Sequence, residues 1–289
     1  MPELIPTLSL TECPRDAMQG LGHFVPTEDK IAYHRLLLAA GFPVLDFGSF
    51  VSPKAIPQMA DTAQVLAAIA PHKHNTKLLA IVANLRGAEQ AAAADGLDIQ
   101  GFPLSVSEQF QQRNTGKSIQ EALSELAKIA QAAHRAGQSL TVYLSMAFGN
   151  PYGELVSAER LAELTRLLVD MGVTDIALSD TVGKGEPAEI ATTFTQMQRA
   201  FPTLTWICHL HARKAQVQAL AAAAIAAGCN HLDTALGGYG GCPLSGDALT
   251  GNLDTDAVLA FAAEAQLATG INIEALAEAR ALLPRVFHP

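Results

Sequence analysis

The 289-residue sequence predicts a (β/α)8 TIM barrel of the α/β class, on two observations. Eight short apolar segments alternate with longer Ala-, Leu- and Glu-rich segments, as expected for strands that each lead into a helix. The helical segments repeatedly end at glycine before the next strand, for instance in AAGFPVLDF and DMGVTDIAL. Glycine after a helix adopts the left-handed conformation without a Cβ penalty. A doubly wound open sheet is the alternative that fits the same alternation.

The expected elements follow one another along the whole chain. Strands are predicted over 8–13, 43–50, 77–84, 96–106, 140–148, 174–182, 204–211 and 230–236. Helices are predicted over 27–40, 57–70, 118–136, 157–171, 187–200, 213–227 and 253–267. No Pro- or Ser-rich linker divides the chain, so we expect one domain over residues 1–289. Its barrel would cover about 8–252, with a C-terminal helical extension over about 253–289.

The composition limits the partners of the protein. Hydrophobic residues make up 49% of the chain and charged residues 16%, which provides for a large core and argues against disorder. The net charge of −9 excludes nucleic acid and anionic membranes as main partners, because both bind dense Lys/Arg surfaces. No apolar segment reaches the roughly 20 residues of a membrane span. The N-terminus lacks secretory features and the four cysteines lack CxxC spacing, so we expect a reduced, cytoplasmic protein.

Polar side chains gather where the expected strands end. In a barrel these carboxyl ends converge on one face, where the following loops build the site. The residues at these ends include Arg15, Asp16, Asp46, Ser49, Asn84, Asp180, Thr181, His209 and His211, and Asn252 follows the last strand. We therefore expect a single site at this end of the barrel.

His209-Leu210-His211 is the strongest local pattern for a metal site. Alternation along a strand places both imidazoles on one face, where they can share an ion. The alternative is a pair of hydrogen-bonded polar residues at a strand end. Asp16 would add a carboxylate and Asn252 a neutral oxygen, and such a mixed N/O set favours Mg²⁺ or Mn²⁺ over structural zinc.

Arg15 and Cys242 are further candidates for a role in the chemistry. Arg15 adjoins Asp16, and a guanidinium there can hold a substrate carboxylate or stabilise an enolate. The alternative for Arg15 is an ion pair with Glu12 or Asp46. Cys242 stands in GGYGGCP, a glycine-rich loop that can bring a thiol over a site, although a lone cysteine is more often inert.

Several motifs together resemble those of the 3-hydroxy-3-methylglutaryl-CoA lyase family of metal-dependent TIM-barrel lyases. The resemblance covers about residues 8–275 and rests on ECPRDAMQ, FGSFVSPKAIPQMADT, SVSEQFQQRNTGKSIQEAL, LSDTVGKGEP, HLHARKAQ and GGYGGCPLSGDALTGNLDT. It implies cleavage of 3-hydroxy-3-methylglutaryl-CoA to acetyl-CoA and acetoacetate, in leucine degradation and ketone-body formation. It also implies a homodimer.

Carried over residue by residue, the resemblance implies a complete site. Its metal ligands fall on Asp16, His209, His211 and Asn252. Its catalytic residues fall on Arg15, Asp16, Asp46, Asp180, His209 and Cys242. Contacts to the acyl-CoA substrate are expected at Gln19, Ser49, Lys54, Asn84 and Thr181.

The resemblance also implies a division of labour. Mg²⁺ or Mn²⁺ would lower the pKa of the substrate hydroxyl, and Asp16, His209 or Asp46 would take its proton. Arg15 would stabilise the thioester enolate that cleavage leaves, and Cys242 would protonate it.

The chain departs from the family pattern at three places. Asp46 stands where the family usually has Glu, Ala-Arg-Lys-Ala at 212–215 replaces Asp-Thr-Tyr-Gly, and the 242–252 segment is longer by about one residue. These departures leave open another 3-hydroxyacyl-CoA substrate. An enzyme that condenses acetyl-CoA with a 2-oxo acid, or a binding barrel without turnover, would have the same fold. The FVSPKxxPQMAD and GGCP motifs favour the lyase.

Overall fold

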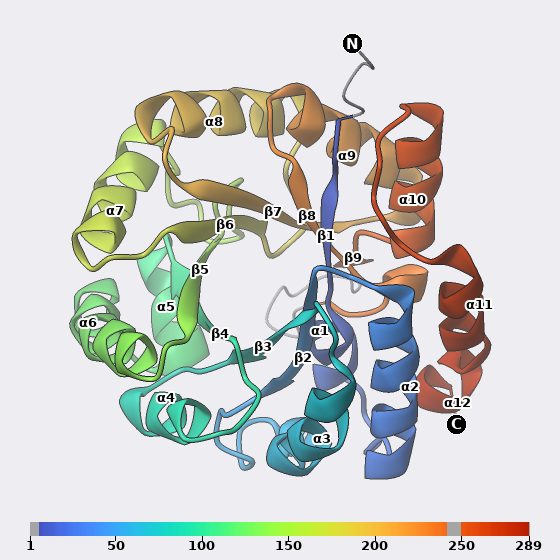
Figure 1. The fold of residues 1–289 in the computed structure, drawn as a ribbon. Coiled ribbons are helices and arrows are strands. Elements are labelled where there is room, and N and C mark those ends of the chain that lie inside the picture. The colour runs from blue at the N-terminus through green and yellow to red at the C-terminus, as the bar shows by residue number, and fades with distance from the viewer. Residues whose placement is uncertain (1–5, 242–249, 289) are drawn as a thin grey trace.

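The computed structural model describes residues 6–241 and 250–288, and in it eight parallel strands close into a barrel (Figure 1). The strands are β1 (Ser9–Glu12), β2 (Val44–Ser49), β3 (Lys77–Ile81), β4 (Ile99–Ser105), β5 (Ser139–Ser145), β6 (Asp175–Asp180), β7 (Thr205–Ala212) and β8 (His231–Thr234). Each pairs with the next, and β8 pairs with β1. This last pairing confirms the barrel and excludes the open sheet. The short β9 (Gly251–Asn252) runs antiparallel to β7.

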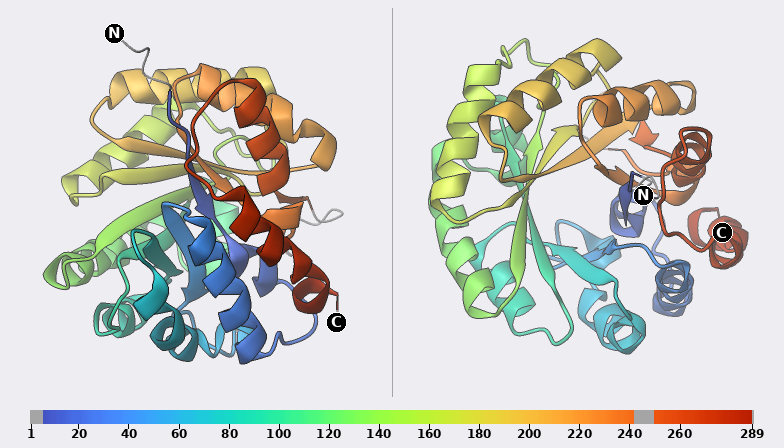
Figure 2. Two further views of the ribbon diagram at one scale, coloured as in Figure 1. Left: turned by 45° about the vertical axis from the view of Figure 1, so that its right-hand side comes forward. Right: turned by 45° about the horizontal axis from the view of Figure 1, so that its top comes forward.

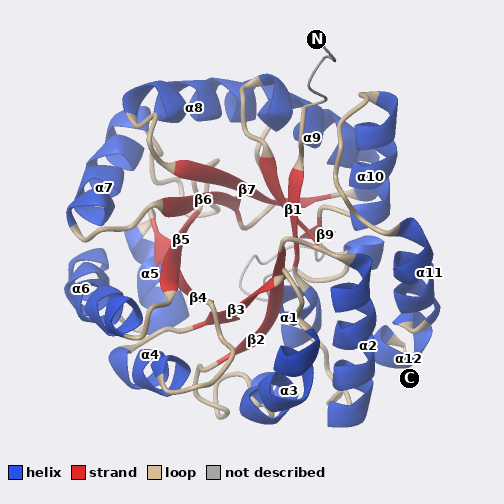
Figure 3. Cartoon of the chain, viewed as in Figure 1, coloured by secondary structure: helices blue, strands red, loops and turns tan. Residues whose placement is uncertain are grey.

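Helices surround the strands, as Figure 3 shows in blue around red. The ring consists of α2 (Thr27–Ala40), α3 (Thr62–Ile69), α4 (Leu85–Ala92), α6 (Ile119–Arg135), α7 (Ala158–Asp170), α8 (Pro187–Ala200), α9 (Val217–Ala226) and α10 (Thr255–Glu264). Two short helices, α1 (Pro14–Gln19) and α5 (Glu108–Thr115), lie in the loops after β1 and β4. Single 3-10 turns occupy Pro57–Met59, Ala70–His72, Lys214–Gln216 and Leu236–Gly238.

The C-terminal helices α11 (Ile273–Ala281) and α12 (Leu283–Phe287) lie against α2, outside the ring (Figure 2). The boundary expected at residue 253 assigned α10 to this extension. Instead, α10 follows β8 and packs beside α9, so it is the eighth helix of the ring. The helical period in the sequence cannot distinguish a helix of the ring from a helix of the extension, because both α10 and α11 show only a helical pattern of apolar residues.

The strands agree with the expected segments, but they are shorter at most ends. Three helices were not expected: α1, α4 and α5. Each has only six to eight residues, too few for a clear helical period. Local signals nevertheless begin them, since Pro14 opens α1 and the side chains of Asn84 and Ser107 cap α4 and α5.

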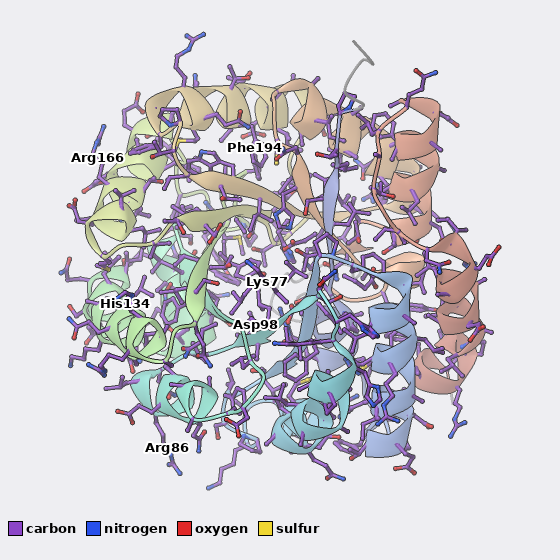
Figure 4. The ribbon with its side chains drawn as sticks, viewed as in Figure 1. Lys77, Arg86, Asp98, His134, Arg166 and Phe194 are labelled. Carbon is purple, nitrogen blue, oxygen red and sulfur yellow. The ribbon has the colours of Figure 1, made fainter. Side chains whose placement is uncertain are left out.

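The core has two layers, one on each face of the strands. Inside the barrel lie Val44, Leu79, Ile81, Ile99, Tyr143, Ala177 and Ile207. A larger apolar layer fills the space between strands and helices; Phe194 of α8 belongs to it, whereas His134 and Arg166 lie at the outer rim (Figure 4). Successive side chains along one strand therefore pack alternately into the inner and the outer apolar layer. None of the helices in the described residues combines the length and the apolar composition of a membrane span.

Glu12, the last residue of β1, is fully buried and links the first strand to the segment that follows β8. Its carboxyl oxygens accept hydrogen bonds from the Leu236 amide at 2.7 Å and from the Thr255 hydroxyl at 2.6 Å. Burial raises the pKa of Glu12 to about 8, against a usual value of 4.5. Glu12 thus ties β1 to the start of α10 and is held in its neutral form near pH 7.

Replacing this acid should change how stability depends on pH. Because the folded pKa is raised, the unfolded chain releases the proton first, and stability falls as pH rises from about 5 to about 8. We expect Glu12→Gln to lose less unfolding free energy than the wild type over this interval, by on the order of 3 kcal/mol. Urea denaturation at both pH values measures this difference. Glu278→Gln, on the exposed face of α11, is the control. Equal pH dependence in wild type and Glu12→Gln would contradict the assignment.

Candidate active site

A cavity of about 300 Å³ lies at the carboxyl ends of the strands. Among the polar residues of its lining are six that the sequence predicted for the site: Arg15, Asp16, Gln19, Thr181, His209 and His211. A second cavity of about 330 Å³ lies at the opposite end, among strand-start residues such as Lys77, Ser139 and Thr205. The six residues of the first cavity belong to the predicted site, and no described residue of that site lines the second cavity, which agrees with the rule for barrel enzymes.

Asp16, His209 and His211 form a buried cluster in this cavity. One ligand atom from each lies within 4.8 Å of the others. The Nε2 atoms of the two imidazoles are 3.3 Å apart, and His211 Nε2 is 3.6 Å from Asp16 Oδ2. The predicted alternation along β7 therefore holds: both imidazoles face the cavity, and Leu210 between them is buried in the layer under the helices.

The other ring nitrogens determine the tautomers. His209 Nδ1 faces Asp233 Oδ2 at 3.1 Å, and His211 Nδ1 faces the Thr250 carbonyl at 3.2 Å. A carbonyl oxygen can only accept a hydrogen bond, so the Nδ1 of His211 carries the hydrogen. The Asp233 carboxylate is also an acceptor, so the Nδ1 of His209 carries a hydrogen as well. Burial lowers the pKa of His211 to about 4, which keeps its ring neutral. Burial opposes a charge on His209, but the hydrogen bond and the charge of Asp233 outweigh it and raise the pKa of that ring. The two Nε2 atoms lie in one region, and when both rings are neutral their lone pairs are ligands for a cation.

Asn252 of β9, predicted as the fourth ligand, lies beside Asp16, although it is not among the residues that line the cavity. Its Nδ2 donates to Asp16 Oδ2 at 2.9 Å and to the Tyr239 carbonyl at 2.9 Å. Its Oδ1 is buried and has no hydrogen-bond partner among the described residues. A buried amide oxygen without a partner is costly unless an ion or water satisfies it. Two imidazoles, a carboxylate and this oxygen therefore fit a divalent cation.

Arg15 is buried between two carboxyl groups. Its Nε and Nη2 donate to Asp46, the latter at 2.5 Å, and its Nη1 donates to Asp16 at 2.8 Å and to Gln19 at 3.0 Å. Although burial opposes the charge, Asp46 and Asp16 raise the pKa of Arg15 further above its ordinary value. Of the five guanidinium N–H groups, one on Nη2 has no partner in the described part of the chain. Arg15 thus pairs with Asp46, and not with Glu12.

The two partners of Arg15 differ in their environments. Burial raises the pKa of Asp46 to about 6, with Arg15 opposing it, and the carboxylate is occupied by the guanidinium. Burial also acts on Asp16, but Arg15 and the two imidazoles outweigh it and lower the pKa of Asp16. Asp16 therefore stays ionised at the cavity, whereas Asp46 lies behind Arg15 and does not line the cavity.

The predicted substrate contacts divide into two groups. Gln19 and Thr181 line the cavity. Ser49 instead bonds the Ile81 carbonyl and the Val51 amide, and Asn84 caps α4 through the Gly87 amide at 2.9 Å. Lys54 is exposed in the loop after β2 and is not among the lining residues.

Asp180 and Cys242 complete the predicted set. The Asp180 carboxylate accepts from the amides of Lys184 and Gly185, at 3.1 and 2.6 Å, and burial raises its pKa. It thereby holds the loop that carries Thr181, and it is not among the residues lining the cavity. Cys242 lies outside the described residues.

Two residues at this site were missed by the sequence analysis. Asp233 of β8 is buried and bonds His209 Nδ1, and Tyr143 of β5 packs edge-on against the His209 ring at 5.6 Å between centroids. The signal for Asp233 was its spacing from His231, which places both on the inner face of the strand. The signal for Tyr143 was weak, because an aromatic residue in a strand usually indicates core.

The chain is similar in sequence and fold to known lyases. The model of the HMGL-like family matches residues 9–283. The mitochondrial hydroxymethylglutaryl-CoA lyase of Bos taurus is 35% identical over 270 residues, covering 93% of this chain and 82% of its own. The cytoplasmic 3-hydroxy-3-methylglutaryl-CoA lyase of Rattus norvegicus is 32% identical, over 92% of this chain and 77% of its own. An Acinetobacter baumannii HMG-CoA lyase, solved with coenzyme A and 3-methylmalate, has a TM-score of 0.91 at 28% identity, over 99% and 93%.

The His209–Asp233 bond generates a test of metal binding. A carboxylate behind a ligating imidazole fixes its tautomer and raises its basicity, and its loss typically weakens metal binding by about 10–100-fold. We expect Asp233→Ala to show such a loss in calorimetric titration with Mn²⁺. Asp233→Asn keeps an oxygen acceptor and should lose less. Asp170→Asn, at the exposed end of α7, serves as control. Wild-type affinity in Asp233→Ala would show that this bond does not support a metal ligand.

Proposed function

The chain belongs to the HMGL-like family, and on this premise we propose that it cleaves 3-hydroxy-3-methylglutaryl-CoA to acetyl-CoA and acetoacetate. It is a lyase that acts on a carbon–carbon bond, as its relatives are named. The observation that carries the proposal is the cluster of Asp16, His209 and His211 beside the buried Arg15, in the cavity at the strand ends. A relative with bound coenzyme A supports an acyl-CoA substrate.

We assign the metal to Asp16, His209, His211 and Asn252. The family depends on a divalent metal, and we propose Mg²⁺ or Mn²⁺ because the donor set lacks thiolate. When bound, such an ion lowers the pKa of a hydroxyl group and orients the substrate. The proton acceptor for that hydroxyl is then Asp16, which lines the cavity. His209 would hold the ion through Nε2 while its Nδ1 carries a hydrogen toward Asp233, and Arg15 occupies Asp46.

Arg15 supplies the positive charge for the enolate. Asp46 and Asp16 fix the guanidinium before substrate arrives, so little reorganisation is needed as charge develops. The Nη2 hydrogen without a partner among the described residues is the donor that remains for the substrate. Asp46 is then a residue that positions Arg15, and Asp180 positions Thr181 through the loop amides.

Further assignments rest on sequence alone. Protonation of the enolate by Cys242 remains a prediction, as do substrate contacts at Ser49, Lys54 and Asn84. The homodimer, the cytoplasmic location and the place in leucine catabolism are also proposals; mitochondrial and cytoplasmic lyases are both among the relatives.

The alternative activity is condensation of acetyl-CoA with a 2-oxo acid. It uses the same kind of enolate, so the barrel and Arg15 do not distinguish it. A binding barrel without turnover is the remaining hypothesis. Release of acetyl-CoA from the proposed substrate, with no 2-oxo acid present, separates the lyase from both.

The first experiment is removal and return of the metal. We expect the purified protein to release acetyl-CoA from 3-hydroxy-3-methylglutaryl-CoA, to lose this activity in a chelator, and to regain it with Mg²⁺ or Mn²⁺. Product release is followed by a coupled acetyl-CoA assay. Activity that survives exhaustive chelation would overturn the metal assignment, and absence of product with either ion would overturn the substrate.

The second experiment removes the guanidinium. Loss of a preorganised donor to a developing oxyanion typically costs about 2.7–4 kcal/mol of barrier. We expect Arg15→Gln to lower kcat by at least about a hundredfold in steady-state assays. Arg166→Gln, at the outer rim of α7, is the matched control (Figure 4). A near-normal kcat in Arg15→Gln would exclude the enolate role.

A further inference from the structure

Tyr239 connects the C-terminal helix α12 with the active site. It follows the Leu236–Gly238 turn after β8. Its ring stacks on Phe287 of α12, with centroids 4.1 Å apart and planes within 2°. Its hydroxyl lies 2.9 Å from His288 Nε2. A half-buried aromatic side chain in a glycine-rich loop thus has two partners, both more than forty residues away in sequence.

Phe287, on which the Tyr239 ring stacks, has further contacts of its own. Phe287 is buried and packs edge-on against Tyr33 of α2, with centroids 6.2 Å apart. Arg285 of α12 forms an ion pair with Asp29 at the start of α2. Phe287 and α12 therefore have contacts to α2, a helix of the ring, in addition to the contact with Tyr239.

The backbone of Tyr239 reaches the proposed metal ligand. Its carbonyl accepts from the Asn252 side-chain Nδ2 at 2.9 Å and from the Asn252 amide at 3.3 Å. Asn252 Nδ2 therefore faces two acceptors, the Tyr239 carbonyl and Asp16 Oδ2, which leaves Oδ1 as the oxygen without a partner in the described structure. The contact is tight, since a Cβ added at Gly240 would lie 2.4 Å from Asn252 Nδ2. A shift of the Tyr239 carbonyl would remove one of the two acceptors that orient the Asn252 side chain.

We propose that Tyr239 is a positioning residue: α12 holds its ring by stacking on Phe287, so that its carbonyl keeps the Asn252 amide oxygen available to the divalent ion. The C-terminal extension then supports the metal site rather than only covering α2. This inference rests on the metal assignment of the proposed function, and it concerns residues outside the cavity lining.

The test measures Mn²⁺ binding by calorimetry, independently of turnover. Tyr239→Leu keeps the carbonyl and an apolar side chain but removes the stacked ring. We expect it to bind Mn²⁺ about fivefold more weakly, the range expected from loss of one aromatic pair. Phe287→Leu should have the same effect from the other side of the stack. The double variant should be no weaker than either single variant, because both remove one interaction.

Two controls separate positioning from general damage. Tyr239→Phe keeps the stack and should restore binding to within about twofold of the wild type. Ile273→Ala, at an exposed position of α11, perturbs the extension without touching the stack. The melting temperature is measured for each variant.

The outcomes are distinct. Wild-type Mn²⁺ affinity in Tyr239→Leu, or full additivity in the double variant, overturns the positioning role while the metal site stands. If the wild type binds no Mn²⁺, the metal assignment of the proposed function fails first, and this inference fails with it.

Discussion

The structure around the cavity depends on the burial of Arg15 between Asp16 and Asp46. A guanidinium removed from water is costly unless its hydrogen bonds and charge are satisfied, and two carboxyl groups satisfy both. A third carboxyl group, on Asp233, lies behind His209. Two carboxyl groups thus flank one fixed cation and a third lies behind an imidazole, so acidic groups outnumber Arg15 around the cluster of Asp16, His209 and His211. This excess of acid favours an additional positive ion there.

Glu12 and Asp16 show how position on the first strand and its loop determines acid chemistry. Both are buried, and they stand four residues apart. Around Glu12 the partners are hydroxyl and amide donors, and burial dominates, so its pKa rises. Around Asp16 a guanidinium and two imidazoles outweigh burial, so its pKa falls. One acid therefore joins strand to helix as a neutral group, whereas the other remains an anion at the cavity.

The sequence predicted the residues whose role follows from periodicity and the end of a strand. His209 and His211 alternate along β7, and Arg15-Asp16 follows β1, so a closed barrel must bring them together. It could not separate Thr181, which lines the cavity, from Asp180, which turns to loop amides. Which of the two side chains faces the cavity depends on the hydrogen bonds that each forms with nearby backbone amides in the folded chain. The same reason explains why Asn84 became a helix cap.

Tyr143 explains why the chemistry is confined to one end of a barrel that has a cavity at each end. Its side chain lines both cavities, so together with the inner apolar layer it separates them. The Tyr143 ring packs edge-on against the His209 ring, and the Nδ1 of His209 is hydrogen-bonded to Asp233. The contact with Tyr143 and the hydrogen bond to Asp233 of β8 thus restrict the orientation of the His209 imidazole. At the opposite mouth the strand-start residues Lys77, Ser139 and Thr205 are exposed, so solvent screens their polar groups. The asymmetry therefore follows burial: the described residues at the carboxyl ends include paired charges held away from water, where each interaction is stronger.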